Sequence, residues 1–261
     1  MSTNKPSKIN KLLGLQPPGV VLTSNWLSEQ GYSPELLRKY RNSQWLFSIG
    51  TGAMIRANDQ IDYLGAIYSL QQQLNLSIHP GAKTALSIQG RIHFLDFSEK
   101  EIYLFGNAKE SLPVWFVNYD WGVKINYYTS SFLPADVGMI LTEKKENFDL
   151  KISSPARAII ECLFLAPQSQ DLMECFQIMQ GLNNLHPQKT QQLLELCTSV
   201  KVKRLFLYLA EKSGHAWFKY LNVENIDLGK GNRSLVKNGI YIKKYKLTVP
   251  REMEKNEYPD L

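Results

Sequence analysis

The feature that most constrains the fold is the stretch Ser33–Ala57, SPELLRKYRNSQWLFSIGTGAMIRA. Its first part predicts a short helix over residues 34–42, because Ser33 is a good N-cap and Pro34 fits the first helical position. Apolar side chains share one arc of that helix and polar side chains share the opposite arc. Two short apolar runs then flank Gly50-Thr51-Gly52, which predicts a tight hairpin. The stretch therefore predicts a basic amphipathic helix followed directly by a two-stranded ribbon.

Two further short helices are predicted before this stretch. Residues 5–13 place apolar side chains on one side, and a second helix capped by Thr23 or Ser24 contains Trp26. Three helices followed by a ribbon is the order of a winged helix-turn-helix, whose third helix enters the DNA major groove. A fourth helix over residues 60–74 is predicted to pack on this unit.

The polar face of the third helix carries side chains of the kinds that bind nucleic acids. Arg38, Lys39, Arg41 and Asn42 lie on that face: Arg can fork onto guanine or phosphate, and Asn can pair with adenine. The hairpin turn is slim enough to approach a DNA backbone, and Arg56 lies at its base. The alternative is a solvated charged face without a ligand, which is the usual fate of such a run of charges.

Charge and composition agree with a globular DNA-binding protein. The 261 residues carry a net charge of +6, and 44% are hydrophobic, which supplies material for a core. Residues 1–60 hold seven basic and three acidic side chains, a net +4, whereas the other 201 residues have a net +2. The first quarter of the chain is therefore where we expect a polyanion to be attracted.

The three cysteines favour an intracellular setting. Cys162, Cys175 and Cys197 are widely spaced and form no CxxC pair, so we expect buried thiols rather than a zinc site or a disulfide framework. The four histidines show no paired ligand spacing either. Without a signal peptide or an apolar run that could span a bilayer, we expect a cytoplasmic protein with no cofactor and no bound metal.

The remaining sequence predicts a mixed domain. After a helix near residues 82–89 come short strands near residues 102–105, 124–128, 137–141 and 148–152, then four helices in succession and a terminal hairpin over residues 239–249. The predicted fold class is α+β, an N-terminal winged helix-turn-helix followed by a larger mixed α/β domain. We place the DNA-binding domain at residues 1–76, the α/β domain at residues 77–250 and a polar tail at residues 251–261.

Two other motifs in this region have alternative interpretations. Asp136 with Glu143 and Lys145 has the residue types of a metal-dependent nuclease, where carboxylates hold Mg²⁺ and a lysine lies near the attacking water. The simpler interpretation is an exposed hairpin tip. The turn DLGKGNRSL, residues 227–235, lacks the GKS or GKT of a phosphate loop, so we expect a plain turn before a strand.

A third motif is the basic start of the fourth C-terminal helix. Lys201, Lys203 and Arg204 precede a strongly apolar face, and cations at a helix N-terminus oppose the helix dipole. We expect these cations on a solvated face, or offset by an acidic partner or a phosphate.

The blocks IHPGAKTALSIQGRIHFL, LPVWF, SSPARAIIECL, SVKVKRLFLYLAEKSGHAW and IDLGKGNRSLVKNGIYIKKYKLTVP, together with the winged helix, resemble the AbiEi antitoxins. These proteins are the regulator half of type IV toxin–antitoxin and abortive-infection (phage-defence) operons. The resemblance covers residues 19–250. Ala156 departs from it, because the family is associated with an acidic residue at that position.

The resemblance implies a non-enzymatic, two-part protein. The winged helix would bind inverted repeats in double-stranded operator DNA and repress its own operon, and the α/β domain would counteract a nucleotidyltransferase toxin of the AbiEii kind. Carried over by position, Arg38, Lys39, Arg41 and Asn42 become groove or phosphate contacts, and Thr51 and Arg56 become wing contacts. Lys201, Lys203 and Arg204 become candidates for toxin neutralisation or a second DNA surface. A metal-dependent nuclease and a winged-helix regulator with a ligand-sensing domain stay as alternatives.

Overall fold

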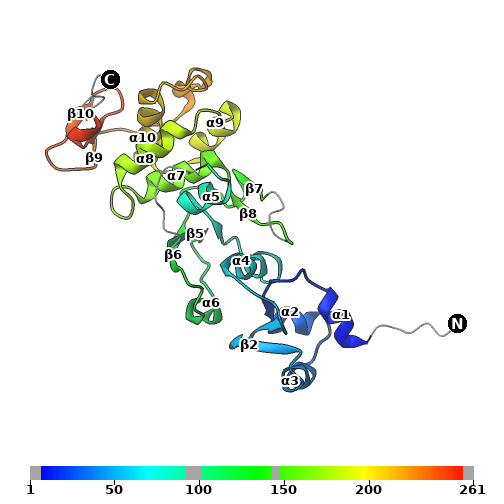
Figure 1. The fold of residues 1–261 in the computed structure, drawn as a ribbon. Coiled ribbons are helices and arrows are strands. Elements are labelled where there is room, and N and C mark those ends of the chain that lie inside the picture. Colours follow the sequence, from blue (N-terminus) through cyan, green and yellow to red (C-terminus); the bar gives the residue numbers. More distant parts are fainter. Residues whose placement is uncertain (1–6, 92–100, 143–146, 255–261) are drawn as a thin grey trace, which may run out of the picture. The chain divides into compact units, whose positions relative to one another are not determined.

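A computed structural model describes residues 7–91, 101–142 and 147–254 of the chain (Figure 1). The chain divides into two compact units. The first unit contains Met1–Pro80, Phe97–Thr129 and Leu141–Ile152, and the second contains Gly81–Asp96, Ser130–Ile140 and Ser153–Leu261. Each unit is therefore assembled from segments that are separated in the sequence, and the domain boundary at residue 76 stays a prediction.

The N-terminal part of the first unit has the elements of a winged helix. They are α1 (Lys8–Gly14), β1 (Leu22–Thr23), α2 (Ser24–Glu29), α3 (Pro34–Asn42), β2 (Leu46–Gly50) and β3 (Ala53–Arg56). The three strands form one sheet in the order β1-β3-β2, and β3 is antiparallel to both neighbours. This arrangement confirms the predicted N-terminal fold and adds the short strand β1.

One apolar cluster holds these elements together. It contains Leu12, Leu22, Leu27, Tyr32, Leu37, Leu46 and Met54, which are all buried. Each helix and each strand of the winged helix contributes at least one member, so burial of this cluster fixes α3 against the hairpin.

The rest of the first unit packs on the winged helix through α4 and α6. It contains α4 (Tyr63–Gln72), β4 (His79–Pro80), β5 (Glu101–Asn107), α6 (Val114–Asn118) and β6 (Lys124–Ser130), and the strands form a sheet in the order β4-β5-β6. Helix α6 packs on β2: a Cβ added to Gly50 would lie 2.8 Å from the Cβ of Trp115. Helix α4 approaches the chain before β1 more closely still, because a Cβ on Gly65 would lie 1.9 Å from the carbonyl oxygen of Gly19.

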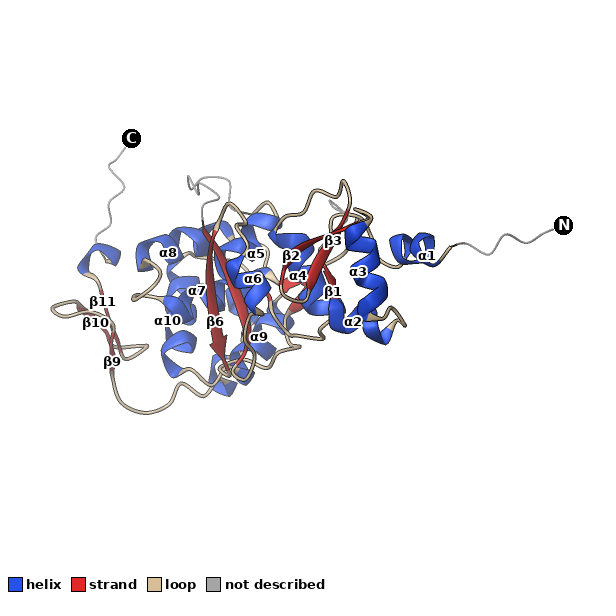
Figure 2. Ribbon diagram, turned by 90° about the horizontal axis from the view of Figure 1, so that it is seen from below, coloured by secondary structure: helices blue, strands red, loops and turns tan. Residues whose placement is uncertain are grey.

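The second unit is mainly helical. It contains α5 (Ala82–Ile88), α7 (Pro155–Leu165), α8 (Leu172–Gly181), α9 (Pro187–Leu196) and α10 (Val200–Lys212). Helix α7 packs against the other four helices of this unit, and Figure 2 shows α7, α8 and α10 side by side. Nine consecutive residues of α10, Val202 to Ala210, are buried, so this helix also lies in the core of the unit.

A small sheet ends the second unit. It consists of β9 (Arg233–Ser234), β10 (Ile240–Ile242) and β11 (Leu247–Val249), in the order β10-β11-β9, followed by a 3-10 turn at Arg251–Met253. Figures 1 and 2 show the three strands as a separate group beside the helices. Strands β7 (Met139–Leu141) and β8 (Lys151–Ser153) form a two-stranded sheet.

The α+β fold class is confirmed, and the bounds of α3 agree with the predicted helix over residues 34–42. The strand predicted over residues 148–152 lies later, at Lys151–Ser153, and neither α6 nor β9 was predicted. In the described part of the chain, no helix combines the length and the apolarity that crossing a membrane requires.

Candidate nucleic-acid interface

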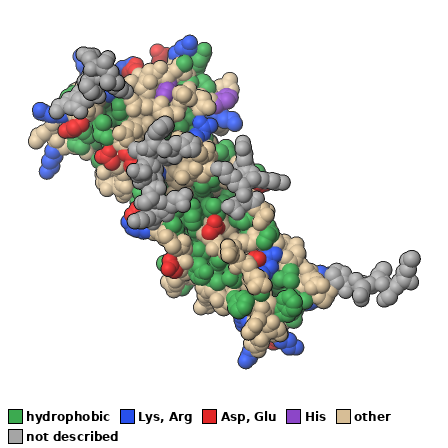
Figure 3. Space-filling model, in the orientation of Figure 1, with side chains coloured by type: hydrophobic (Ala, Val, Ile, Leu, Met, Phe, Trp, Pro, Cys, Tyr) green, Lys and Arg blue, Asp and Glu red, His purple; other side chains and the backbone are tan. Residues whose placement is uncertain are grey.

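Helix α3 presents a basic face because its ends are capped and its apolar side is buried. Ser33 Oγ accepts a hydrogen bond from the amide of Leu36 at 3.3 Å, and Pro34 occupies the first turn, as predicted. Leu37 lies in the apolar cluster, while Leu36 and Tyr40 are partly buried against it. The residues on the opposite face are exposed: Arg38, Lys39, Arg41 and Asn42. Figure 3 shows Lys and Arg side chains gathered over α3.

The wing turn is held in place by backbone and side-chain contacts. The amide of Ser24 donates to the carbonyl of Gly52 at 2.8 Å, and Ser48 Oγ donates to the carbonyl of Gly50 at 3.2 Å. Thr51, at the tip, is exposed. The hairpin therefore presents Thr51 next to the start of α2 rather than extending freely into solvent.

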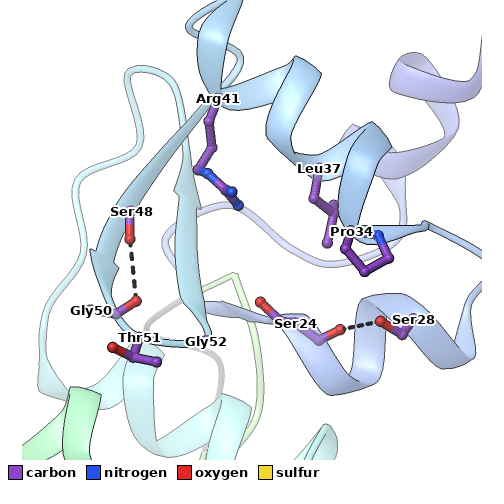
Figure 4. Close-up of a pocket in the computed structure, with 9 residues that line it drawn as sticks. All are labelled: Ser24, Ser28, Pro34, Leu37, Arg41, Ser48, Gly50, Thr51 and Gly52. Atoms are coloured by element: carbon purple, nitrogen blue, oxygen red, sulfur yellow. Dashed lines mark hydrogen bonds between the residues drawn. The ribbon is translucent and has the colours of Figure 1, made fainter.

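A pocket of about 400 Å³ lies between α2, α3 and the wing (Figure 4). Its lining consists of Ser24, Ser28, Pro34, Leu37, Arg41, Ser48, Gly50, Thr51 and Gly52. The guanidinium of Arg41 points into it, and Nη1 makes a 3.3 Å contact with the Sδ of Met54. A thioether is a weak acceptor and a guanidinium has five N–H donors, so donors remain for a ligand. One guanidinium beside the hydroxyl groups of Ser24 and Thr51 suits a phosphate, whereas the hydroxyl groups of Ser28 and Ser48 donate their protons to the carbonyls of Ser24 and Gly50.

Ser24, Ser28 and Ser48 line the pocket, and the sequence did not predict them as site residues. They belong to α2 and β2, and only the folded hairpin brings them next to Arg41. No local signal marks Ser48 in particular, because it is the single hydroxyl residue of β2.

Arg56 has a structural role, which corrects its prediction as a wing contact. The residue is 8% exposed, and its guanidinium donates to the carbonyls of Leu13, Gln16 and Pro17 and pairs with Asp59 at 3.1 Å. Its donors thus hold the segment after α1 to β3. Arg56 does not contribute to the exposed face of the wing.

The basic start of α10 is also turned inward. Arg204 is 1% exposed and donates to four backbone carbonyls, and Lys203 is 4% exposed. Lys201 is half-buried, donates to the carbonyls of Phe164 and Ala166, and has a pKa lowered by burial. The three side chains therefore do not form a solvated basic surface: backbone carbonyls accept from Lys201 and Arg204, and Lys203 is buried. Their part in toxin neutralisation stays a prediction.

The residues of the alternative nuclease centre are only partly described. Asp136 is exposed, and Glu143 and Lys145 lie outside the described residues. Among the residues that the structure describes, no group of three or more His, Cys, Asp and Glu could hold a metal ion. The three cysteines are buried, and burial raises the pKa of each thiol, which keeps them protonated and unreactive.

Comparison with known proteins agrees with a winged-helix regulator. Residues 5–97 match the AbiEi antitoxin N-terminal domain of transcriptional regulators, and residues 99–250 match the transcriptional regulator, AbiEi antitoxin, of type IV toxin–antitoxin systems. The chain is similar in fold to the crystal structure of the RV2827C protein from Mycobacterium tuberculosis, with a TM-score of 0.59 and 15% identity over 92% of this chain and 88% of that chain. A search of curated proteins gives no match. Because the two family matches extend over residues 5–97 and 99–250, the chain belongs to the AbiEi antitoxins, the transcriptional regulators of type IV toxin–antitoxin systems.

Proposed function

We propose that this AbiEi antitoxin represses its own operon by binding inverted repeats in double-stranded operator DNA, with α3 in the major groove and the wing against the backbone. The supporting observation is the exposed face of α3, where Arg38, Lys39, Arg41 and Asn42 lie beside the hydroxyl-lined pocket. In this proposal residues 1–76 are the DNA-binding domain. Residues 77–250 counteract a nucleotidyltransferase toxin, residues 251–261 are a polar tail, and the antitoxin itself catalyses no reaction. Such a repressor acts in the cytoplasm, where its operon is transcribed.

The pocket gives the proposal a specific geometry. A phosphate in it would meet the guanidinium of Arg41 and the hydroxyl groups of Ser24 and Thr51. Such a contact positions a protein on the duplex without reading sequence, whereas base edges are read by the remaining polar side chains of the helix. We assign Arg38 and Asn42 to the base edges for this reason.

Operator binding is tested with the DNA upstream of the gene. A protomer that neutralises about five phosphates gives a slope of about −4 to −5 in a plot of log K against log salt. The Arg38→Ala/Arg41→Ala variant is expected to bind more weakly with a shallower slope and an unchanged fold. The matched control is Lys109→Ala/Lys151→Ala, which removes two exposed charges of the same unit outside this interface. Equal affinity of the α3 variant and the wild type for the operator would refute the assignment.

Toxin neutralisation needs a separate measurement. Co-expression with the neighbouring nucleotidyltransferase should restore growth, and the Arg38→Ala/Arg41→Ala variant should still restore it, since its C-terminal region is unchanged. A neighbouring gene of another class, or a toxin whose effect the antitoxin leaves unchanged, would contradict this part of the proposal.

A further inference from the structure

The strongest concentration of charge lies near the C-terminus rather than in the winged helix. Residues 227–251 contain seven Lys or Arg and one Asp, a net charge of +6. The other 236 residues contain 23 basic and 23 acidic side chains, so this segment carries the whole net charge of the chain. By comparison, residues 1–60 carry a net +4.

The seven cations are all exposed on one small module. We call β9, β10, β11 and the turns between them, residues 227–251, the basic tip. Its cations are Lys230, Arg233, Lys237, Lys243, Lys244, Lys246 and Arg251. Figure 3 shows Lys and Arg side chains over this part of the molecule.

Few carboxylates balance this charge. Within the described residues, Lys244 pairs with Glu211, and the other six cations form no ion pair. The acidic residue of the segment, Asp227, is engaged in its own turn, since its Oδ1 accepts a hydrogen bond from the amide of Gly229 at 2.8 Å. The charge of the basic tip is therefore directed to solvent.

Arg204 arranges the first turn of the basic tip from beneath. Its guanidinium donates to the carbonyls of Leu228, Gly229 and Gly231 at 2.8, 3.1 and 2.7 Å. In a trans peptide the N–H of the next residue points away from the carbonyl, so the amides of Lys230 and Asn232 point away from Arg204. Gly229 and Gly231 have φ values of +59° and +73°, and this left-handed geometry suits glycine. The turn thus directs two backbone donors outward beside the side chains of Lys230 and Arg233, an arrangement that favours an anion.

The composition of the basic tip fits a polynucleotide better than a protein. Protein–protein interfaces are depleted in lysine and have an apolar centre. Here five of the seven cations are lysines, and the exposed large apolar side chains of the segment are Ile240 and Tyr241. Nucleic-acid interfaces are instead strongly basic and take Tyr, Asn and backbone N–H donors to phosphate. We propose that the basic tip binds the phosphodiester backbone of a polynucleotide, as a second surface that acts without the winged helix.

The test removes charge from the basic tip in full-length protein. The variant is Lys237→Gln/Lys243→Gln/Lys246→Gln, and the control Lys109→Gln/Lys151→Gln/Lys189→Gln removes the same number of exposed charges elsewhere. Both are made in the Arg38→Ala/Arg41→Ala background, so that failure of the operator proposal and failure of this one give different results. Circular dichroism checks that each variant is folded.

Fluorescence anisotropy then measures binding to a 20-base-pair duplex without operator sequence and to a folded RNA hairpin of similar charge. At about 0.1 M salt we expect the tip variant to bind at least about tenfold more weakly, with a slope that falls by about 0.9 for each duplex contact removed. The control should keep its affinity, and the tighter of the two probes identifies the source of the phosphates. Equal affinities of the tip variant and the control, or displacement of both probes by polyglutamate at the same charge concentration, would overturn the proposal.

Discussion

Arg157 Nε donates a hydrogen bond of 2.8 Å to Glu161 Oε1 one turn further along α7, and both side chains are buried. The carboxylate also accepts from Ser153 Oγ and from the amide of Ala82. On the other side, Arg157 Nη1 donates to the carbonyls of Pro134 and Val137. This one ion pair therefore connects α7 to the residue just before it, Ser153, and to two segments of the second unit that are more distant in the sequence.

Breaking the pair should destabilise the protein strongly. Glu161→Ala leaves the charge of Arg157 buried without its partner, and we expect a loss of about 3–5 kcal/mol in the free energy of unfolding. Arg157→Met/Glu161→Met should lose less, because it removes both charges and retains side-chain volume. Urea unfolding followed by circular dichroism measures both. As a control, Lys124→Ala breaks an exposed pair with Glu101 and should have little effect. A larger loss in the double variant than in Glu161→Ala would contradict this account.

Arg56 offers a second stability prediction, in the winged helix. Arg56→Ala removes the donor from three partly buried carbonyls and from Asp59, and we expect a loss of about 3 kcal/mol in unfolding free energy. The control, Arg38→Ala, changes an exposed side chain and should stay within about 0.5 kcal/mol of the wild type. The operator affinity of folded Arg56→Ala protein should equal that of the wild type. If the Arg56→Ala variant had wild-type stability but bound the operator more weakly, Arg56 would be a DNA contact of the wing.

The sequence correctly predicted those elements whose formation depends on residues that are close together in the chain. Ser33 and Pro34 mark the start of α3, and the apolar residues of α10 recur at helical spacing, because caps and helical periodicity act within a few residues. The strand β1 was missed because its two residues become a strand only by pairing with Ala53 and Met54.

The roles of the basic residues could not be assigned in the same way. Arg56 and Arg204 have the same side chain as Arg41, yet their acceptors are carbonyls that lie about 40 residues away for Arg56 and 24 to 42 residues away for Arg204. A cation in a sequence does not reveal whether folding will bring carbonyls to it. The positions of those carbonyls, and of the hydroxyl groups around Arg41, are properties of the tertiary structure.

Arg41 is the residue through which the phosphate pocket can be tested. Arg41→Lys keeps the charge but loses the fork of donors, so we expect operator binding to weaken by about 1 kcal/mol, roughly fivefold, with an unchanged salt slope. The reciprocal control Lys39→Arg, on the exposed face of the same helix, should not weaken binding. Anisotropy titrations at four salt concentrations separate the two effects. A slope that becomes shallower by about 0.9 in Arg41→Lys would show that the lysine makes no phosphate contact.

Tyr127 provides a prediction of pH dependence in the first unit. Its hydroxyl donates to the carbonyl of Glu110 at 3.1 Å, and burial, with the charge of Glu110 as a smaller cause, raises its pKa to about 12. Above pH 10 the unfolded chain loses this proton while the folded protein keeps it. The contribution of Tyr127 to the free energy of unfolding is therefore fully present below pH 10 and is lost as the pH rises through about 12. Stability should therefore fall less steeply between pH 9 and pH 11 in Tyr127→Phe than in the wild type. Urea unfolding of both proteins at pH 7, 9, 10 and 11 measures the difference, with pH 7 to 9 as the internal control. Parallel curves for the two proteins above pH 10 would show that the Tyr127 phenol does not have the raised pKa.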